Sequence, residues 1–206
     1  PQITLQSTPP LPLSTIMAYL LFGQDLAEIN SYQALQLANS LASLAGEGPD
    51  VLETTRRSLG VDLVPFKTCT YDCIYCQLGR TTTRTLERAE YVPLEFVLSE
   101  LDRKLSEGSL PDYVTLSGSG EPTLYARIEQ MVAGIRERTR IPIAVITNGS
   151  LLGDPTVRHD LSDVEVVLPS LDAGNAISFR CVNRPHPGLS YERMVDGLRT
   201  FRREFD

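Results

Sequence analysis

The chain has 206 residues, 42% of them hydrophobic, which is enough to bury the core of one domain or of one domain with an appendage. Its 26 acidic and 19 basic residues give a net charge of -7, and the sequence shows no large basic patch, which argues against broad affinity for a nucleic-acid backbone. No apolar run reaches the length of a membrane span, and four cysteines in so long a chain are no disulfide framework, so we expect a protein of the reducing cytoplasm with no membrane partner.

The start of the chain differs in character from the rest. An extended stretch over residues 1–8 runs into several prolines, and short helices are predicted at residues 15–22 and 31–46. We therefore predict a mostly helical N-terminal appendage over residues 1–58 and a second domain over residues 59–206.

In the second domain, short apolar runs alternate with amphipathic helices, which is the pattern of βα units around a parallel sheet. Strands are predicted at residues 60–66, 112–118, 141–148 and 164–171, and helices at residues 93–108, 122–139, 155–161 and 190–205. Met131 and Met194 lie in phase with Leu and Ile, which predicts core positions for both. The sequence thus predicts an α/β domain of about four βα units, with its site at the carboxyl ends of the strands.

Three cysteines, Cys69, Cys73 and Cys76, follow the first predicted strand in a C-x3-C-x2-C loop. Three thiolates at this spacing can hold three corners of a cubane iron-sulfur cluster and leave one iron open for a substrate-like ligand. A zinc site is the main alternative, but it needs a fourth ligand that normally lies close by, and Cys181 is far along the chain. We predict Cys181 to be a buried small apolar residue.

The cysteine motif, with an aromatic residue before its last cysteine, resembles that of the radical S-adenosylmethionine superfamily. The resemblance continues in order through "SGSGEPTL", "ITNGS", "LPSLDAG" and "NRPHPG", and covers residues 58–206. The wording is most similar to the branch that includes the tricyclic wyosine-base tRNA enzymes and their uncharacterised iron-sulfur oxidoreductase relatives.

This resemblance implies a [4Fe-4S] cluster on Cys69, Cys73 and Cys76, with S-adenosyl-L-methionine chelating the open iron. It further implies an enzyme that reductively cleaves this cofactor to a 5'-deoxyadenosyl radical and takes electrons from a donor such as flavodoxin or ferredoxin. The substrate is unknown, and a tRNA base is the expectation from the branch.

The resemblance also implies where the cofactor binds: Tyr75 near the adenine, a glycine-rich loop at the methionine end, and four strand-end residues facing the methionine and ribose. The loop is Gly118, Ser119, Gly120, Glu121 and Pro122, with Ser119 where the family has a glycine, and the strand-end residues are Thr147, Asn148, Ser170 and Asp172. Asn148 and Gly149 could equally close their strand as a simple turn, and no catalytic residue is implied.

The number of βα units and the start of the chain both depart from what this resemblance implies. Relatives build a partial TIM barrel of six βα units, whereas four are predicted here, so we expect an incomplete, C-terminally truncated barrel. Residues 1–58, with "STPPLP", "LLFG" and "ALQLA", resemble instead the C-terminal segment of the TamB-like family of envelope translocation and assembly factors. The alternative to an enzyme is therefore a non-catalytic fragment or chimera that binds a cluster or zinc without turnover.

Overall fold

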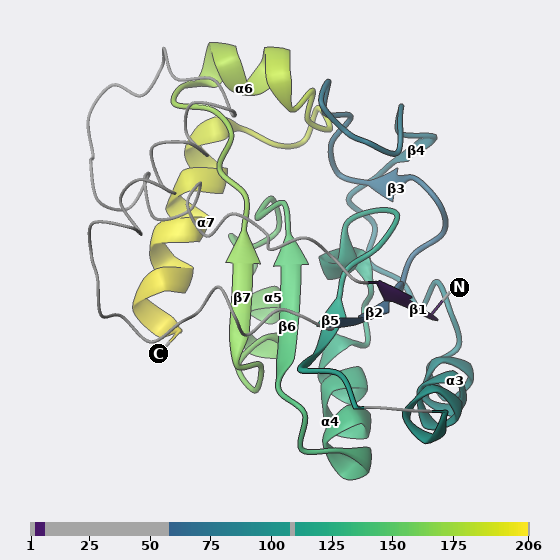
Figure 1. Cartoon of the computed structure of the whole chain (residues 1–206). Coiled ribbons are helices and arrows are strands. Elements are labelled where there is room, and N and C mark those ends of the chain that lie inside the picture. The colour runs from purple at the N-terminus through teal and green to yellow at the C-terminus, as the bar shows by residue number, and fades with distance from the viewer. Residues whose placement is uncertain (1–2, 7–57, 108–109, 206) are drawn as a thin grey trace, which may run out of the picture.

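A central five-stranded sheet organises the computed structural model, which describes residues 3–6, 58–107 and 110–205 (Figure 1). Its strands, in spatial order, are β1 (Ile3–Gln6), β2 (Ser58–Val61), β5 (Tyr113–Leu116), β6 (Ile143–Thr147) and β7 (Val166–Pro169). The last four are mutually parallel, and β1 runs antiparallel to β2 with Ile3 opposite Val61. The predicted α/β fold with four parallel strands is confirmed. The first parallel strand is shorter than predicted, because it ends at Val61, and the helices predicted within residues 7–57 lie outside the described residues.

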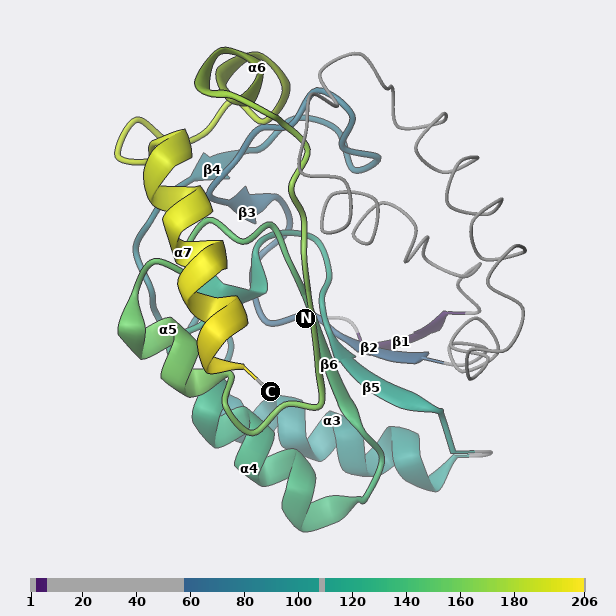
Figure 2. The ribbon, with the colours of Figure 1, turned by 90° about the vertical axis from the view of Figure 1, so that its left-hand side faces the viewer.

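Four helices lie on one face of this sheet (Figure 2). They are α3 (Leu94–Ser106), α4 (Ile128–Arg138), α5 (Pro155–Asp160) and α7 (Tyr191–Glu204), one after each parallel strand, as in a partial TIM barrel. Within the described ranges, no helix has the length and apolar character needed to cross a membrane.

The helix predicted from residue 122 begins later than expected. Pro122–Leu124 form a 3-10 turn, η1, and Tyr125 then pairs with Ala89 in an isolated parallel bridge. Ala126 N–H also donates to the Ala89 carbonyl, which keeps this segment extended, so α4 starts only at Ile128.

Periodic apolar residues bury the helices against the sheet, as the sequence predicts. Leu94, Val97, Leu98 and Leu101 of α3 are buried, as are Ile128, Met131, Val132 and Ile135 of α4. They pack in one cluster with Leu59 and Val61 of β2, Val114 and Leu116 of β5, and Ile143 and Val145 of β6. Full burial of one such side chain stabilises the fold by roughly 1.5–3 kcal/mol relative to exposure.

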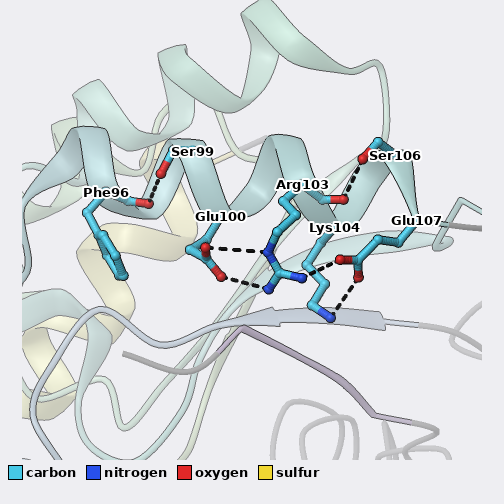
Figure 3. A network of polar contacts seen from close by, with 7 residues as sticks. All are labelled: Phe96, Ser99, Glu100, Arg103, Lys104, Ser106 and Glu107. Atoms are coloured by element: carbon cyan, nitrogen blue, oxygen red, sulfur yellow. Dashed lines mark hydrogen bonds and ion pairs between the residues drawn. The ribbon is translucent and has the colours of Figure 1, made fainter.

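The solvent face of α3 carries a chain of ion pairs (Figure 3). Arg103 lies between Glu100, at 2.8 Å, and Glu107, and Lys104 Nζ also reaches Glu107 at 3.0 Å. Each cation therefore has a carboxylate one helical turn away, the spacing at which side chains on a helix meet.

A second, smaller apolar cluster supports the segment that contains the cysteines. It joins Tyr71 to Phe179 and Met194, with ring centroids of Tyr71 and Phe179 5.3 Å apart in an edge-to-face arrangement. Phe179 lies on α6 (Ala176–Val182), a helix that was not predicted and that lies beyond the carboxyl ends of the strands in Figure 1. A two-stranded parallel pair, β3 (Thr68–Cys69) with β4 (Thr83–Arg84), frames the same segment.

Candidate functional site

Cys69 ends β3, and Cys73 and Cys76 lie in the loop between β3 and β4, whose backbone is tied to the end of α6. Asp72 N–H donates to the Asn183 carbonyl at 3.0 Å, and Ile74 N–H donates to the Val182 carbonyl at 2.9 Å. Cys69, Cys73 and Cys76 are all half-buried. Segments more than a hundred residues apart in sequence thus fix the loop on both sides of Cys73.

Each of the three sulfurs has its own nitrogen donor. Lys67 Nζ lies 3.0 Å from Cys76 Sγ, Asn148 Nδ2 lies 3.5 Å from Cys69 Sγ, and Asn183 Nδ2 lies 3.6 Å from Cys73 Sγ. Hydrogen bonds to ligating sulfur are among the features that set the reduction potential of an iron-sulfur cluster. Of these donors, only Asn148 is among the site residues expected from the sequence.

Burial raises the pKa of two of the three thiols. It raises the pKa of the Cys69 thiol to about 11, with the Glu121 carboxylate adding to the effect. Burial also raises the pKa of the Cys73 thiol. Thiols bind metal as thiolates, so any metal bound by these cysteines would displace protons from them.

Lys67 is held in an unusual position. It is a buried lysine with φ of 60°, in the left-handed region that residues other than glycine seldom adopt. Its N–H donates to the Ser119 carbonyl at 2.8 Å, so the backbone of the glycine-rich loop fixes it. Such strain persists where the surroundings over-determine it, commonly at functional sites.

The glycine-rich loop packs directly against the cysteine segment, and its glycines are needed for that packing. A Cβ on Gly120 would lie 1.9 Å from the Thr68 carbonyl oxygen, and Gly118 has φ of 151° with the Asp62 side chain 2.4 Å from where its Cβ would be. Ser119, at the position where the resemblance implies a glycine, donates from its N–H and its hydroxyl to Asp62 Oδ2. This serine therefore has a local hydrogen-bond partner.

Glu121 is a buried anchor of this loop. Its Oε1 accepts from the Thr123 N–H and hydroxyl and from the Thr147 hydroxyl, and its Oε2 accepts from Asn148 N–H at 2.7 Å. Burial raises the pKa of its carboxyl, against these hydrogen bonds. Glu121 thereby ties η1 to the carboxyl end of β6, where two of the predicted site residues lie.

The strand-end residues of β6 and β7 meet at this anchor. Asn148 Oδ1 accepts from Ser150 N–H and Gly149 has φ of 74°, so this is an Asn-Gly turn. The side-chain nitrogen of Asn148 nevertheless contacts the Cys69 sulfur, and it also donates to the Thr70 hydroxyl at 2.8 Å. Ser170 N–H donates to the Thr147 carbonyl at 3.0 Å, which keeps the two strand ends together.

Tyr75 and Asp172 form a pair on the other side of the cysteine loop. The Tyr75 hydroxyl donates to Asp172 Oδ2, and Asn183 Nδ2 donates to the same oxygen at 2.9 Å. Burial and the Asp172 charge both raise the pKa of Tyr75. The Tyr75 side chain is still about half exposed, so the ring is accessible to a ligand.

The environment of the Tyr71 hydroxyl indicates whether a group could bind among the cysteines. Its hydroxyl is buried and, within the described part of the chain, has no hydrogen-bond partner. Burial raises the pKa of this hydroxyl, and so do the nearby Glu121, Cys73 and Cys69. A buried hydroxyl without a partner is costly, and a group bound among the cysteines would supply an acceptor. Three thiols with sulfur-directed N–H donors are also the donor set of a cluster.

The residues that the structure describes contain no group of three or more His, Cys, Asp or Glu side chains placed to hold one metal ion. In a cubane cluster each cysteine binds a separate iron, so the fit does not require the thiols to converge on one point. Cys181 is exposed on α6, so its predicted burial is wrong. The helix turns Phe179 to the core, and a residue two positions further lies about 200° around the axis.

Two family models match this chain. The model of the radical SAM superfamily matches residues 63–206, and the model of the TamB C-terminal domain matches residues 1–83. Both halves of the predicted two-part resemblance are thereby confirmed. The matches overlap over residues 63–83, the segment that contains all three cysteines of the motif.

Curated relatives match most of this chain but only part of themselves. "GTPase Obg" of Brachyspira hyodysenteriae is 42% identical over 158 residues, 77% of this chain and 23% of that protein. "UPF0026 protein MJ1312" of Methanocaldococcus jannaschii is 35% identical over 157 residues, 75% of this chain and 49% of that protein. The "S-adenosyl-L-methionine-dependent tRNA 4-demethylwyosine synthase" of Oryza sativa subsp. japonica is 23% identical over 159 residues, 68% of this chain and 24% of that protein. The chain thus spans about half the length of these relatives or less. The Gly-x-x-x-x-Gly-Lys-Ser/Thr signature of phosphate-binding loops does not occur in its sequence.

Proposed function

The chain belongs to the radical S-adenosylmethionine superfamily, and from this premise we propose that it binds a [4Fe-4S] cluster through Cys69, Cys73 and Cys76 and cleaves S-adenosyl-L-methionine reductively. The observation that supports the proposal most is the set of three thiols at the carboxyl ends of parallel strands, each with its own N–H donor. When bound, the cluster and cofactor supply an electron and a 5'-deoxyadenosyl radical that abstracts hydrogen from a substrate. A reducing environment preserves free thiols, so a cytoplasmic location is part of the proposal.

The chain's own residues would position the cofactor. The glycine-rich loop from Gly118 to Pro122 would face the methionine end, and Glu121 would act through the loop because its oxygens are already occupied. The carbonyls of Ser119, Glu121 and Pro122 already accept from the N–H groups of Lys67, Leu124 and Tyr125. The carbonyls of Gly118 and Gly120 would therefore receive the cofactor's ammonium. Thr147, Asn148 and Ser170 would line the strand ends in between.

Tyr75 and Asp172 would hold the nucleoside end of the cofactor. The half-exposed Tyr75 ring offers a face for an adenine, and its hydroxyl is fixed by Asp172. Asp172 also holds Asn183, and through it the environment of Cys73. Nucleoside binding and cluster binding would therefore share one hydrogen-bonded group.

Anaerobic reconstitution of the full chain tests the function. We expect about four irons and four sulfides per chain, the visible absorption of a cubane cluster, and 5'-deoxyadenosine once reductant and S-adenosyl-L-methionine are added. Cys73→Ala should abolish cluster assembly, and Cys181→Ala, which removes an exposed thiol, should leave it intact. A cluster without 5'-deoxyadenosine would favour the non-catalytic alternative, and zinc alone would contradict any cluster.

For the substrate we propose a tRNA base, supported by the distant plant relative whose name states a tRNA product. Transfer of deuterium from a labelled tRNA base into 5'-deoxyadenosine would support this. Formation of 5'-deoxyadenosine that tRNA leaves unchanged in amount and isotope content would contradict it.

We also propose a domain boundary near residue 58, with the cofactor-binding domain over residues 59–206. The support is that the superfamily match starts at residue 63, close to the first parallel strand. A shortened chain that begins at Ser58 should still fold and take up iron on anaerobic reconstitution. Failure of this shortened chain to fold would contradict the boundary.

A further inference from the structure

A solvent-open pocket of about 860 Å³ lies on the outer side of the cysteine segment. Its wall includes Arg80, Arg84, Arg180 and Arg184, together with Asp72 and His186, and we call it the arginine pocket. In Figure 2, β4 and the connection from α6 to α7 lie on the left, the side that also carries α5 and α7. The sequence did not reveal this group of cations, because it comes from positions as far apart as 80 and 184.

The arginine pocket has more positive charge than its own carboxylate balances. Asp72 is shared between Arg80 and Arg184, each 3.8 Å away. Asp72 also accepts from the Thr81 N–H at 2.8 Å, so its carboxylate is already shared among three donors. The Arg180 guanidinium, on α6, has no hydrogen bond or ion pair with any part of the chain that the structure describes. In a chain of net charge -7, this pocket is a local positive site.

The same backbone that lines the arginine pocket also holds a cysteine. Asp72 precedes Cys73, and Arg184 follows Asn183, whose amide contacts the Cys73 sulfur at 3.6 Å. Asp72 N–H donates to the Asn183 carbonyl at 3.0 Å, which joins the two segments. Two residues of the pocket wall, Asp72 and Arg184, are therefore direct chain neighbours of Cys73 and of the residue that contacts its sulfur.

We propose that the arginine pocket docks an acidic one-electron carrier protein that reduces the cluster. This inference depends on the proposed function, since reductive cleavage consumes an electron that the chain does not supply. In the docked pair, the carrier is oxidised by one electron and the cluster is reduced by one, with no bond made or broken. Complementary charge accelerates such encounters, and it matters here because an acidic carrier is otherwise repelled by an acidic chain.

Exposure and position favour a protein over an RNA or a small anion. The Arg80 side chain is 85% exposed, which suits steering of a large partner better than enclosure of a small anion. Ile177 is 69% exposed and lies on α6 one turn before Arg180, so an apolar contact adjoins the cations. Tyr75 and Asp172, the residues assigned to the cofactor, are not part of the pocket wall.

The test compares two double variants with the same loss of charge. Arg80→Gln with Arg180→Gln removes two pocket cations, and Arg103→Gln with Arg199→Gln removes two cations from α3 and α7. The reconstituted proteins are mixed anaerobically with flavodoxin hydroquinone, and bleaching of the cluster is followed by stopped-flow absorption at several salt concentrations. Titanium(III) citrate serves as a reductant that needs no docking.

We expect the pocket variant to be reduced by flavodoxin about tenfold more slowly at low salt, with the difference shrinking as salt rises. The α3/α7 variant should stay within about twofold of the unaltered protein, and titanium(III) citrate should reduce all three proteins equally.

Equal slowing of both double variants, or no slowing of either, would overturn the inference. Slower reduction of the pocket variant by titanium(III) citrate as well would also overturn it, because this result would indicate a damaged cluster site. Loss of tRNA binding in the pocket variant with unchanged flavodoxin kinetics would assign the pocket to RNA instead. Failure of the unaltered protein to assemble a cluster would overturn the proposed function itself, and this is seen before any carrier is added.

Discussion

The solvent face of α3 and the cysteine segment use the same kinds of cation in opposite ways. On α3, Arg103 has a glutamate on either side, so its charge is neutralised within the helix (Figure 3). At the cysteine segment, Lys67 is buried and its ammonium faces a sulfur, while the arginine pocket shares one aspartate. The neighbours of a basic side chain, more than its residue type, therefore decide whether its charge is neutralised locally or acts on another group.

The two regions also differ in how they are held in place. The α3 pairs are exposed side-chain contacts, which solvent and salt screen and which individually contribute little to stability. The cysteine segment is held by backbone contacts, such as that of Gly120 with Thr68, and by the buried carboxylate of Glu121. Perturbations of the cysteine segment should therefore have larger effects than perturbations of α3.

The largest effect is expected where backbone meets backbone. In Gly120→Ala, the new methyl group would lie 1.9 Å from the Thr68 carbonyl oxygen, and neither chain segment can yield easily. We expect a loss of at least about 3 kcal/mol in the free energy of unfolding, measured by urea denaturation, together with loss of cluster assembly. Gly174→Ala is the matched control, because nothing lies within 4 Å of its Cβ position, and it should be neutral or stabilise by about 0.4–1 kcal/mol. Similar stability of the two variants would contradict a backbone clamp.

The next effect concerns the buried carboxylate. Glu121→Gln keeps the size of the side chain but sets an amide donor against the Asn148 N–H or the threonine donors. We expect a loss of about 1–3 kcal/mol in the free energy of unfolding, because a buried donor then lacks an acceptor. Glu129→Gln, an exposed change on α4, should stay within about 0.5 kcal/mol. If both changes cost the same, Glu121 is not the anchor of the loop.

How far the sequence predicts these regions depends on the range of the contacts. The helices and strands follow from short apolar periods, so α3 and the four parallel strands could be placed from local pattern alone. Cys69, Cys73 and Cys76 could be named because they are close together in sequence. Lys67 and Asn183 escaped notice because each becomes a sulfur donor only through folding, and no local pattern marks a buried lysine with positive φ. Cys181 was misjudged because α6 itself was not predicted.

A third effect tests whether the buried cation acts on the sulfur. Lys67→Met keeps most of the buried stem and removes the charge 3.0 Å from Cys76 Sγ. The reduced cluster is the more negative form, so its reduction potential should fall, by on the order of 50 mV, which is roughly tenfold in the one-electron equilibrium. The reduction potential is measured by a redox titration monitored by electron paramagnetic resonance. Lys104→Met, on α3, is the control. Equal potentials in the Lys67 variant and the unaltered protein would show that Lys67 only fills space.

The smallest effect is expected on α3, and it completes the comparison because it asks whether a neutralised cation matters at all. Arg103→Gln breaks the contacts with Glu100 and Glu107 and removes the cation between them, although Glu107 keeps its contact with Lys104. Both glutamates are solvated and the lost pairs are screened, so the free energy of unfolding should fall only slightly at low salt. The loss should shrink further at high salt, since the repulsion between the two glutamates is screened as well. Urea denaturation at two salt concentrations checks this. A loss as large as that of Glu121→Gln, independent of salt, would mean that the α3 ion pairs support the fold and that exposure does not separate the two regions.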